Sequence, residues 1–295
     1  MSAFGPAGDD AGPLAIICGG GNFPFLVADA AQRRGRGVLL FAIRGWADPV
    51  AVARYPHHWA GLGQFGRFRR LARAAGCRDV VIIGTMLRPS ILNLRPDLAS
   101  LRYLPRIARL LRGGDNHLLS GIARVLFEAN GFRVIGAHEV APDILVPEGV
   151  LGRHRPCERD HADMARGLAL IAAMGPFDIG QAVVVADNYV LAVEAAEGTD
   201  QMLARVAALR RERRVRLSGK VGVLVKAPKP AQDRRLDLPS VGARTVAAAA
   251  EAGLAGIAVE AKGAITADVA AFVEAADAAG LFVFGIAAPA PPERL

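Results

Sequence analysis

The sequence predicts an α/β protein, with an N-terminal domain built on an open parallel sheet and a C-terminal α/β domain built on a mixed sheet. Three observations support this class. Short apolar runs rich in Val, Ile and Ala recur between helical stretches. A glycine-rich turn separates the first run from the first helix. Hydrophobic residues make up 52% of the 295 residues and charged residues 22%, which is typical of a folded protein with a large core.

The N-terminal domain is expected over residues 1–145, with the Gly-, Ala- and Asp-rich residues 1–12 disordered. Apolar runs predict its strands at residues 14–18, 38–43, 79–84 and 132–135. Helical patterns are found at residues 26–31, 66–75, 102–112 and 117–130. Such an order of elements is expected to bring the ends of the first three strands to one edge of the sheet, where ligands collect in open α/β sheets.

The first strand is followed by Gly19, Gly20, Gly21 and Asn22, and then by a helix. Such a turn lets backbone amides approach an anionic ligand, although a plain tight turn explains the glycines nearly as well. The dinucleotide fingerprint is not met, because Pro24 replaces its third glycine and the second strand ends in Arg44 rather than an acid. We therefore disfavour a nicotinamide-dependent oxidoreductase. Arg44 and Thr85 follow the second and third strands and are candidate ligand contacts.

The C-terminal domain is expected over residues 158–295, after a Pro- and Gly-rich linker at about 141–157. Apolar runs predict strands at residues 182–185, 189–193, 221–225, 253–260 and 281–286. Helical patterns are found at residues 160–174, 202–209, 240–252 and 266–279. Candidate functional residues come directly before the helices expected at 202–209 and 240–252.

The stretch 220–242 is the strongest candidate for the chemistry. A buried strand ends in a loop with two prolines, which holds Lys226 and Lys229, two of only four lysines in the chain. Asp237 follows, and Leu238-Pro239-Ser240 reads as a helix start, so its carboxylate is expected at a helix N-terminus. This pattern suits a phosphorylated substrate, with Asp237 as metal ligand or base. The alternative is a solvated basic turn after an edge strand.

A second acidic segment holds Glu194, Glu197 and Asp200. Thr199 or Asp200 is expected to cap the helix that follows. Capping does not account for Glu194 and Glu197, and the alternative is that these carboxylates lie beside a bound Mg²⁺.

The net charge of +8 allows contact with nucleic acid, anionic membrane or a phosphate substrate. The basic residues lack interleaved aromatics and any nucleic-acid motif, so no nucleic-acid partner is expected. Arginines share one face of the helix expected at 102–112, either as a membrane contact or as a solvated face: Arg102, Arg106, Arg109 and Arg112. Three scattered cysteines and the lack of a long apolar run or signal peptide predict a cytoplasmic protein.

Seven strings along the chain carry a family resemblance, in the order LAIICGGGNFP, GAHEV, DIGQAVVV, LAVEAAEGTD, KAPKPAQDRRLDLPSVG, GLAGIAVEA and LFVFGI. Together they resemble the UDP-2,3-diacylglucosamine pyrophosphatases of the LpxI type, from about residue 14 to residue 287. The fifth string is long and specific, and it contains both lysines and the aspartate singled out above.

The resemblance implies a Rossmann-like N-terminal domain, a C-terminal α/β domain and a homodimer. It implies Mg²⁺-dependent hydrolysis of UDP-2,3-diacylglucosamine to UMP and 2,3-diacylglucosamine 1-phosphate (lipid X) in lipid A biosynthesis in Gram-negative bacteria. Water is expected to attack the phosphorus that bears the sugar, and the enzyme is expected in the cytoplasm, with peripheral contact to the inner membrane. A binding module for a nucleotide-sugar or lipid, without hydrolysis, is the alternative.

The same resemblance suggests roles for individual residues. Asp237 matches the aspartate that the family needs for turnover, with Lys226 and Lys229 as further catalytic residues. Asp237 and Asp200 are the suggested metal ligands. The remaining substrate contacts are expected at Gly19, Gly20, Gly21, Asn22, Arg44, Thr85, Gln181, Glu194, Thr199 and Gln232.

Overall fold

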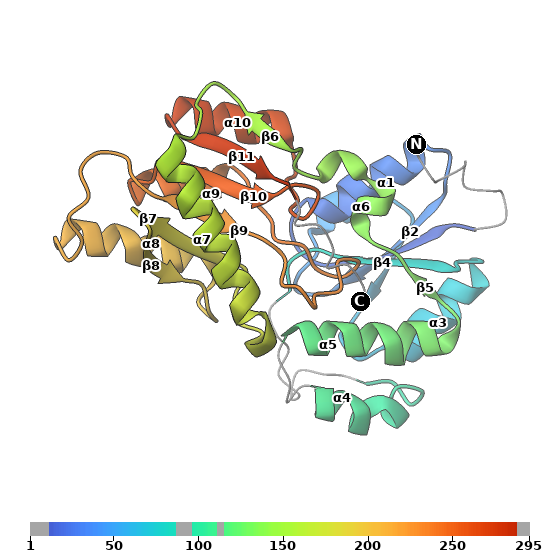
Figure 1. The fold of residues 1–295 in the computed structure, drawn as a ribbon. Helices are drawn as coiled ribbons and strands as arrows, with labels where there is room; N and C mark the ends of the chain where they lie inside the picture. The colour runs from blue at the N-terminus through green and yellow to red at the C-terminus, as the bar shows by residue number, and fades with distance from the viewer. Residues whose placement is uncertain (1–11, 87–95, 111–114, 288–295) are drawn as a thin grey trace, which may run out of the picture. The chain divides into compact units, whose positions relative to one another are not determined.

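The computed structural model describes residues 12–86, 96–110 and 115–287, and the chain divides into two compact units (Figure 1). The first unit contains Met1–Pro142 together with Arg235–Asp237, and the second contains Asp143–Arg234 and Leu238–Leu295. The disorder expected for residues 1–12 falls outside the described residues, except at Gly12. A short segment from the second half of the sequence thus belongs to the first unit.

The first unit is built on a five-stranded parallel sheet with the strand order β3-β2-β1-β4-β5. Its strands are β1 (Leu14–Cys18), β2 (Val38–Ile43), β3 (His57–Ala60), β4 (Asp79–Ile83) and β5 (Arg133–Val134). This confirms the open parallel sheet expected from the sequence. Strand β3 was not predicted, because its sequence HHWA contains no apolar run.

Helices cover both faces of this sheet, with α1 (Phe23–Arg33) and α6 (Ala137–Val140) on one side and α3 (Phe65–Ala74) and α5 (Asp115–Ile122) on the other (Figure 1). A π-helical turn (Ala123–Phe127) and a 3₁₀ turn (Glu128–Asn130) continue α5. The core on the α3 side is aromatic: Phe68 packs against Phe41 and Phe127 at ring distances of 4.6 and 5.2 Å.

The remaining helices of the first unit are short. They are α2 (Pro49–Val52), a 3₁₀ turn at Leu101–Tyr103 and α4 (Leu104–Leu110). The single basic helix expected over residues 102–112 is therefore a 3₁₀ turn followed by a two-turn helix, and Arg112 lies outside the described residues. Arg102 stacks on Tyr103 at 4.7 Å and donates a 2.6 Å hydrogen bond to its hydroxyl.

The second unit is built on a six-stranded mixed sheet with the order β6-β11-β10-β9-β7-β8, which confirms the predicted mixed-sheet domain. Its strands are β6 (Gly149–Leu151), β7 (Ala182–Ala186), β8 (Tyr189–Val193), β9 (Val223–Lys226), β10 (Gly256–Glu260) and β11 (Phe282–Ile286). The central strands β9, β10 and β11 are parallel, and the outer ones are antiparallel to their neighbours. Strand β6 lies inside the range expected as a linker.

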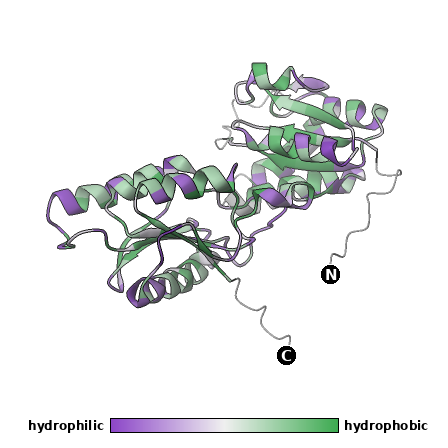
Figure 2. Ribbon diagram, turned by 90° about the horizontal axis from the view of Figure 1, so that it is seen from above, coloured by the Kyte–Doolittle hydropathy of each residue, from purple (hydrophilic) through white to green (hydrophobic). Residues whose placement is uncertain are grey.

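Helices again cover both faces. The long helix α7 (Glu158–Met174) packs on one face, and α8 (Gly198–Arg211), α9 (Ala243–Glu251) and α10 (Val269–Ala278) pack on the other. Short 3₁₀ turns lie at Pro142–Ile144 and Gly175–Phe177. In Figure 2 the strands are coloured mostly as hydrophobic, whereas the helices mix hydrophobic and hydrophilic residues, as expected for helices that cover a buried sheet.

The sequence prediction was wrong about the start of α9. Residues 238–240 do not begin a helix: Ser240 forms a parallel β-bridge with Ile265, and Ile265 donates its amide to the carbonyl of Pro239. Helix α9 begins at Ala243, after Gly242. The pairing with Ile265 extends the backbone, so Asp237 does not lie at a helix N-terminus.

Within the described residues, no helix is both long and apolar enough to cross a membrane.

Candidate functional site

Lys226 is the last residue of β9, the strand that pairs with β10 on one side and with β7 on the other. Its side chain is buried, with 6% of the residue exposed. The Nζ donates hydrogen bonds of 2.9 Å to the Oγ1 of Thr199 and 3.0 Å to the carbonyl of Ser240. A buried ammonium costs free energy unless it is paired, so these bonds determine where the charge lies.

Glu194, which directly follows β8, completes a connected chain of hydrogen bonds. Its Oε1 accepts a 2.7 Å bond from the hydroxyl of Thr199, and its Oε2 accepts a 2.8 Å bond from the amide of Gln181. The structure thus brings four predicted site residues together. We call Gln181, Glu194, Thr199, Lys226 and Ser240 the Lys226 network.

Lys229 lies in the loop after β9, and it is also buried, at 7% exposure. Its ammonium pairs with the carboxylate of Asp178, and its amide donates a 2.9 Å bond to the Oε1 of Gln232. The backbone amide of Gln232 donates a 3.0 Å hydrogen bond to the carbonyl of Lys229. Lys229 and Gln232 are therefore brought together as predicted site residues. Asp178 was missed, although it is the first residue of the DIGQAVVV string.

The alternative of a solvated basic turn after an edge strand is excluded. Both lysines are buried, and β9 is an interior strand of the sheet. Two ammonium groups at the carboxyl end of a parallel strand are suited to an anionic ligand.

The acidic residues near the start of α8 form ion pairs with arginines. Asp200 pairs with Arg244, and Glu197 lies 3.0 Å from Arg205. Helix α8 begins at Gly198 without a side-chain cap, so the expectation that Thr199 or Asp200 caps it was wrong. The hydroxyl of Thr199 instead bonds to Glu194 and Lys226 within the Lys226 network.

No group of three His, Cys, Asp or Glu residues suited to a metal ion occurs in the part of the chain that the structure describes. The two suggested metal ligands fall in different units, Asp237 in the first and Asp200 in the second. Mg²⁺ also binds through one or two carboxylates plus substrate phosphates, and a lone aspartate oxygen is the kind of donor it prefers.

The glycine turn after β1 is used mainly for packing against β4. The amides of Gly19 and Gly20 donate to the carbonyls of Ile83 and Thr85 at 2.9 Å, and Thr85 returns its amide to Gly20. A Cβ on Gly19 would lie 2.8 Å from the Gly84 backbone, so only glycine allows this approach. Gly19 and Gly20 thus use their amides inside the sheet.

Other predicted contacts of the first unit lie at the same sheet edge. Gly21 has a φ of 83°, and Asn22 precedes α1 without a side-chain cap bond. Arg44, after β2, places its guanidinium 5.9 Å from the centre of the Trp59 ring. Thr85 follows β4, next to β1 in the sheet, so the predicted clustering of strand ends is confirmed.

The fold and these contacts define an α/β protein with a parallel sheet of the nucleotide-binding order in one unit and two buried lysines at a strand end in the other. The family models for the LpxI N-terminal and C-terminal domains match residues 13–144 and 147–284. The chain is 43% identical over 275 residues to UDP-2,3-diacylglucosamine pyrophosphatase LpxI of Caulobacter vibrioides, covering 92% of this chain and 97% of that protein. The chain belongs to the LpxI family.

A solved structure of UDP-glucose-4-epimerase from Stenotrophomonas maltophila, with bound NAD and formylated UDP-arabinopyranose, was also matched. It covers 96% of this chain and 88% of its own at 14% identity, with a TM-score of 0.30. That similarity is too low to bear on the function.

Proposed function

We propose that this protein hydrolyses the pyrophosphate bond of UDP-2,3-diacylglucosamine, giving UMP and 2,3-diacylglucosamine 1-phosphate for lipid A biosynthesis. The 43% identity to a UDP-2,3-diacylglucosamine pyrophosphatase, spread over 92% of the chain, carries this proposal. The buried lysines support it, because hydrolysis of a pyrophosphate requires stabilisation of the negative charge on the phosphates.

In this proposal, Lys226 and Lys229 neutralise the pyrophosphate. Their side chains have little freedom, because Thr199 and Ser240 hold one ammonium and Asp178 holds the other. Cations fixed in advance need no rearrangement when charge develops on the departing phosphate. Water attacks the phosphorus that bears the sugar, the bond to the bridging oxygen breaks, and that oxygen leaves with UMP.

Asp237 is the proposed residue for the attacking water or for Mg²⁺. A carboxylate can accept a proton from water or orient it. When bound, Mg²⁺ would supply positive charge to the phosphate oxygens, with the Asp237 carboxylate as its protein ligand. Asp200, the second suggested ligand, would have to exchange its contact with Arg244 for the metal.

The test is incubation of the full chain with UDP-2,3-diacylglucosamine, with and without Mg²⁺, followed by mass spectrometry. UMP and lipid X formed only with Mg²⁺ is the expected result, and the oxygen of ¹⁸O-labelled water is expected in lipid X. The Asp237→Ala variant should bind substrate and lose turnover. Tight binding without turnover by the unmodified protein would replace the proposal with that of a binding module.

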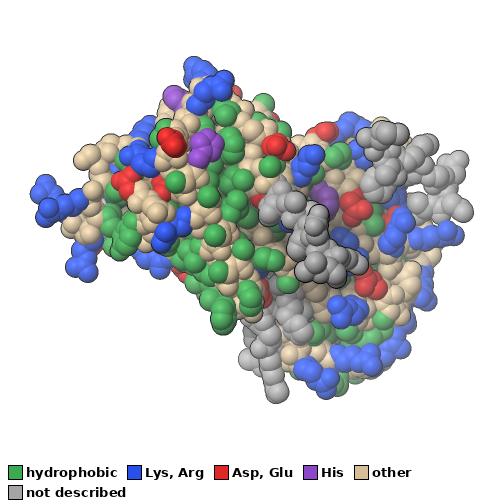
Figure 3. Space-filling view, viewed as in Figure 1, with side chains coloured by type: hydrophobic (Ala, Val, Ile, Leu, Met, Phe, Trp, Pro, Cys, Tyr) green, Lys and Arg blue, Asp and Glu red, His purple; other side chains and the backbone are tan. Residues whose placement is uncertain are grey.

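We also propose peripheral contact with an anionic membrane, since the substrate is a lipid. Arg102, Arg106 and Arg109 are exposed on the first unit, and Figure 3 shows basic side chains, all of them arginines, over the region of α3 and α4. Co-sedimentation with vesicles of phosphatidylglycerol, but not of phosphatidylcholine, is expected. Loss of binding in a variant with Arg106 and Arg109 changed to Gln would support this surface.

A homodimer is proposed on the family resemblance alone. Light scattering on the purified chain measures the mass of the particle, and a value of twice 31.0 kDa is expected.

A further inference from the structure

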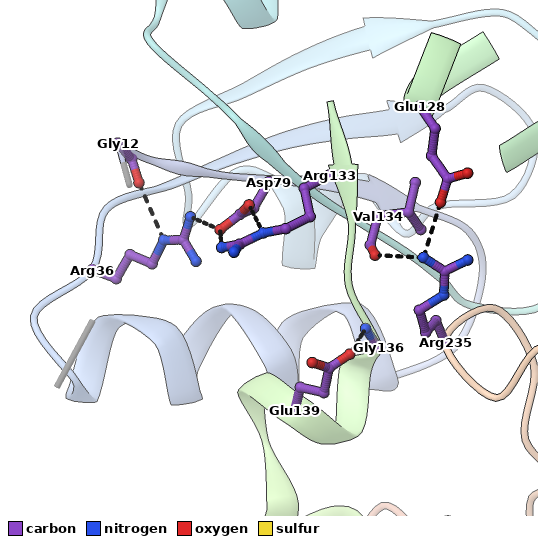
Figure 4. Close-up of polar contacts among 9 residues, drawn as sticks. All are labelled: Gly12, Arg36, Asp79, Glu128, Arg133, Val134, Gly136, Glu139 and Arg235. Atoms are coloured by element: carbon purple, nitrogen blue, oxygen red, sulfur yellow. Dashed lines mark hydrogen bonds and ion pairs between the residues drawn. The ribbon is translucent and has the colours of Figure 1, made fainter. Parts of the chain in front are cut away.

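The segment Arg235–Asp237 follows β9 and its loop in the sequence but belongs to the first unit. The Nη1 of Arg235 donates a hydrogen bond of 2.9 Å to the Oε1 of Glu128 and one of 3.2 Å to the carbonyl of Val134 (Figure 4). Leu236 packs against the aromatic core of the same unit. Leu236, directly before the suggested catalytic aspartate, is therefore held by packing against a core, and Arg235 is held by an ion pair.

The acceptors of Arg235 are themselves fixed. Val134 lies in β5, the last strand of the five-stranded sheet. The amides of its neighbours Arg133 and Ile135 donate to the carbonyls of Arg78, just before β4, and of Val80, within β4, so the carbonyl of Val134 points to the open edge. An unpaired edge carbonyl is a ready acceptor, and the guanidinium of Arg235 occupies the place of a donor from a further strand.

Glu128, the second acceptor, begins the 3₁₀ turn that follows the π-helical turn Ala123–Phe127. Phe127, immediately before it, is buried in the aromatic core beside Phe65 and Phe68. The carboxylate that receives Arg235 thus lies on a backbone fixed by packing. A fork of N–H donors on a planar cation suits two acceptors placed in this way.

The preceding residue, Arg234, makes its ion pair elsewhere. Its Nη1 lies 2.7 Å from the Oε1 of Glu260, a buried residue at the end of β10 in the second unit. Consecutive arginines thus pair with glutamates of different units, so the segment joins the first unit at Arg235 and not earlier.

We propose that Arg235 is a positioning residue, which fixes the Asp237 carboxylate through its bonds to Glu128 and Val134. Only Leu236 separates the two residues, and its packing prevents the backbone between them from turning freely. This inference rests on the proposed function, in which Asp237 takes part in hydrolysis. Arg235 is not proposed to touch the attacking water or the phosphate, and it acts through Asp237.

The test compares Arg235→Gln and Glu128→Gln with the control Arg133→Gln. Arg133 lies on the same strand as Val134 and bonds Asp79 at 2.7 Å, so its loss also removes an ion pair from this sheet (Figure 4). Arg235→Gln and Glu128→Gln should each lower kcat by about 10- to 100-fold, because a displacement on the order of 1 Å has effects of this size. KM should change by less than about threefold, since Lys226 and Lys229 still bind the phosphates.

Two further measurements separate positioning from general stability. Arg235→Lys keeps a charged donor and should recover part of kcat, whereas Arg133→Gln should keep kcat at a comparable loss of thermal stability. Amide hydrogen exchange, which does not depend on turnover, should be faster at residues 235–237 in Arg235→Gln than in Arg133→Gln.

Unchanged kcat in Arg235→Gln, or equal losses in Arg235→Gln and Arg133→Gln, would overturn the inference and leave the proposed function intact. Unchanged exchange at residues 235–237 would overturn the anchoring itself. If the unmodified protein has no turnover, the proposed function and the assignment to Asp237 both fall, although faster exchange in Arg235→Gln would still show the anchor.

Discussion

The Nζ of Lys226 donates to the Oγ1 of Thr199 at 2.9 Å, and the same hydroxyl donates onward to Glu194 at 2.7 Å. A hydroxyl has one proton, so accepting from the ammonium and donating to the carboxylate fixes its orientation. The negative charge of Glu194 is thereby linked to the positive charge of Lys226 without direct contact. The hydroxyl of Thr199 thus lies between the two charged groups and bonds to both.

Thr199→Val should lower kcat/KM by about tenfold or more and destabilise the second unit by about 2 kcal/mol, because the ammonium of Lys226 and the partly buried carboxylate of Glu194 both lose a hydrogen-bond partner. Steady-state kinetics and denaturant unfolding measure the two effects.

Thr199→Ser is the matched control for that substitution, since it keeps the hydroxyl and removes only a methyl group. It should retain most of the activity. Equal losses in the serine and valine variants would show that packing by the methyl, rather than the hydrogen bonds, is what matters.

Gly19→Ala should destabilise the first unit by about 1–3 kcal/mol, the usual cost of forcing extra atoms into a packed region. Its Cβ would lie 2.8 Å from the backbone of Gly84. Gly242→Ala is the control, since no atom lies within 4 Å of its Cβ and its backbone is extended. That variant should unfold within about 0.5 kcal/mol of the unmodified protein. Comparable stability of both variants would contradict the close approach of β1 and β4.

Acid should weaken the first unit partly through Asp79. Burial opposes ionisation of this carboxyl, but hydrogen bonds from Arg133 and Arg36 outweigh it and lower the pKa. A carboxyl with a depressed pKa stabilises the fold above its ordinary value of about 3.9, and this contribution is lost as the pH falls towards the folded-state pKa. The free energy of unfolding should therefore fall below about pH 5.

Tryptophan fluorescence measures this effect selectively, because both tryptophans, Trp46 and Trp59, belong to the first unit. Asp79→Asn should be less stable at neutral pH and should lose less stability on acidification. A variant with the same acid dependence as the unmodified protein would show that other carboxyls control the transition.

Thiol labelling should distinguish the three cysteines. Burial raises the pKa of Cys18 to about 11 and also raises the pKa of Cys77, so few thiolates form there near neutral pH. Cys157 is exposed. One thiol per chain should react with Ellman's reagent in the folded protein and three after unfolding. Cys157→Ser should abolish the fast reaction, and a fast reaction that persists would contradict the burial of the other two.

The sequence was sufficient to predict the strands with continuous apolar runs, including Val223–Lys226, because such runs have few alternatives in a protein with this composition. It was not sufficient for His57–Ala60, whose edge strand forms by pairing with β2 rather than by its own propensity. Residues 238–240 also show the limit. Pro239 follows the pattern of a helix start, but pairing with Ile265 extends the chain.

For the candidate site, the sequence indicated several residues that the fold brings together but not the hydrogen bonds that connect them. Glu194 and Thr199, which were expected to contact substrate, bond to each other, and Thr199 also accepts a hydrogen bond from Lys226. Asp178 was not selected, because its partner Lys229 is 51 residues away in the sequence and only the fold brings them together. A hydrogen-bond network of this kind depends on tertiary contacts, which no local pattern encodes.

The assignment of residues 235–237 to the first unit has a consequence for how the chain can be cut. A polypeptide that ends near residue 142 would lack Leu236 from its aromatic core and Arg235 from the edge of its sheet. A polypeptide that begins after residue 142 would carry Asp237 on a segment that has lost the contacts of Arg235 and Leu236 with the first unit. The parts of the chain before and after residue 142 are thus not separable modules, because the first unit is completed by residues that come late in the sequence.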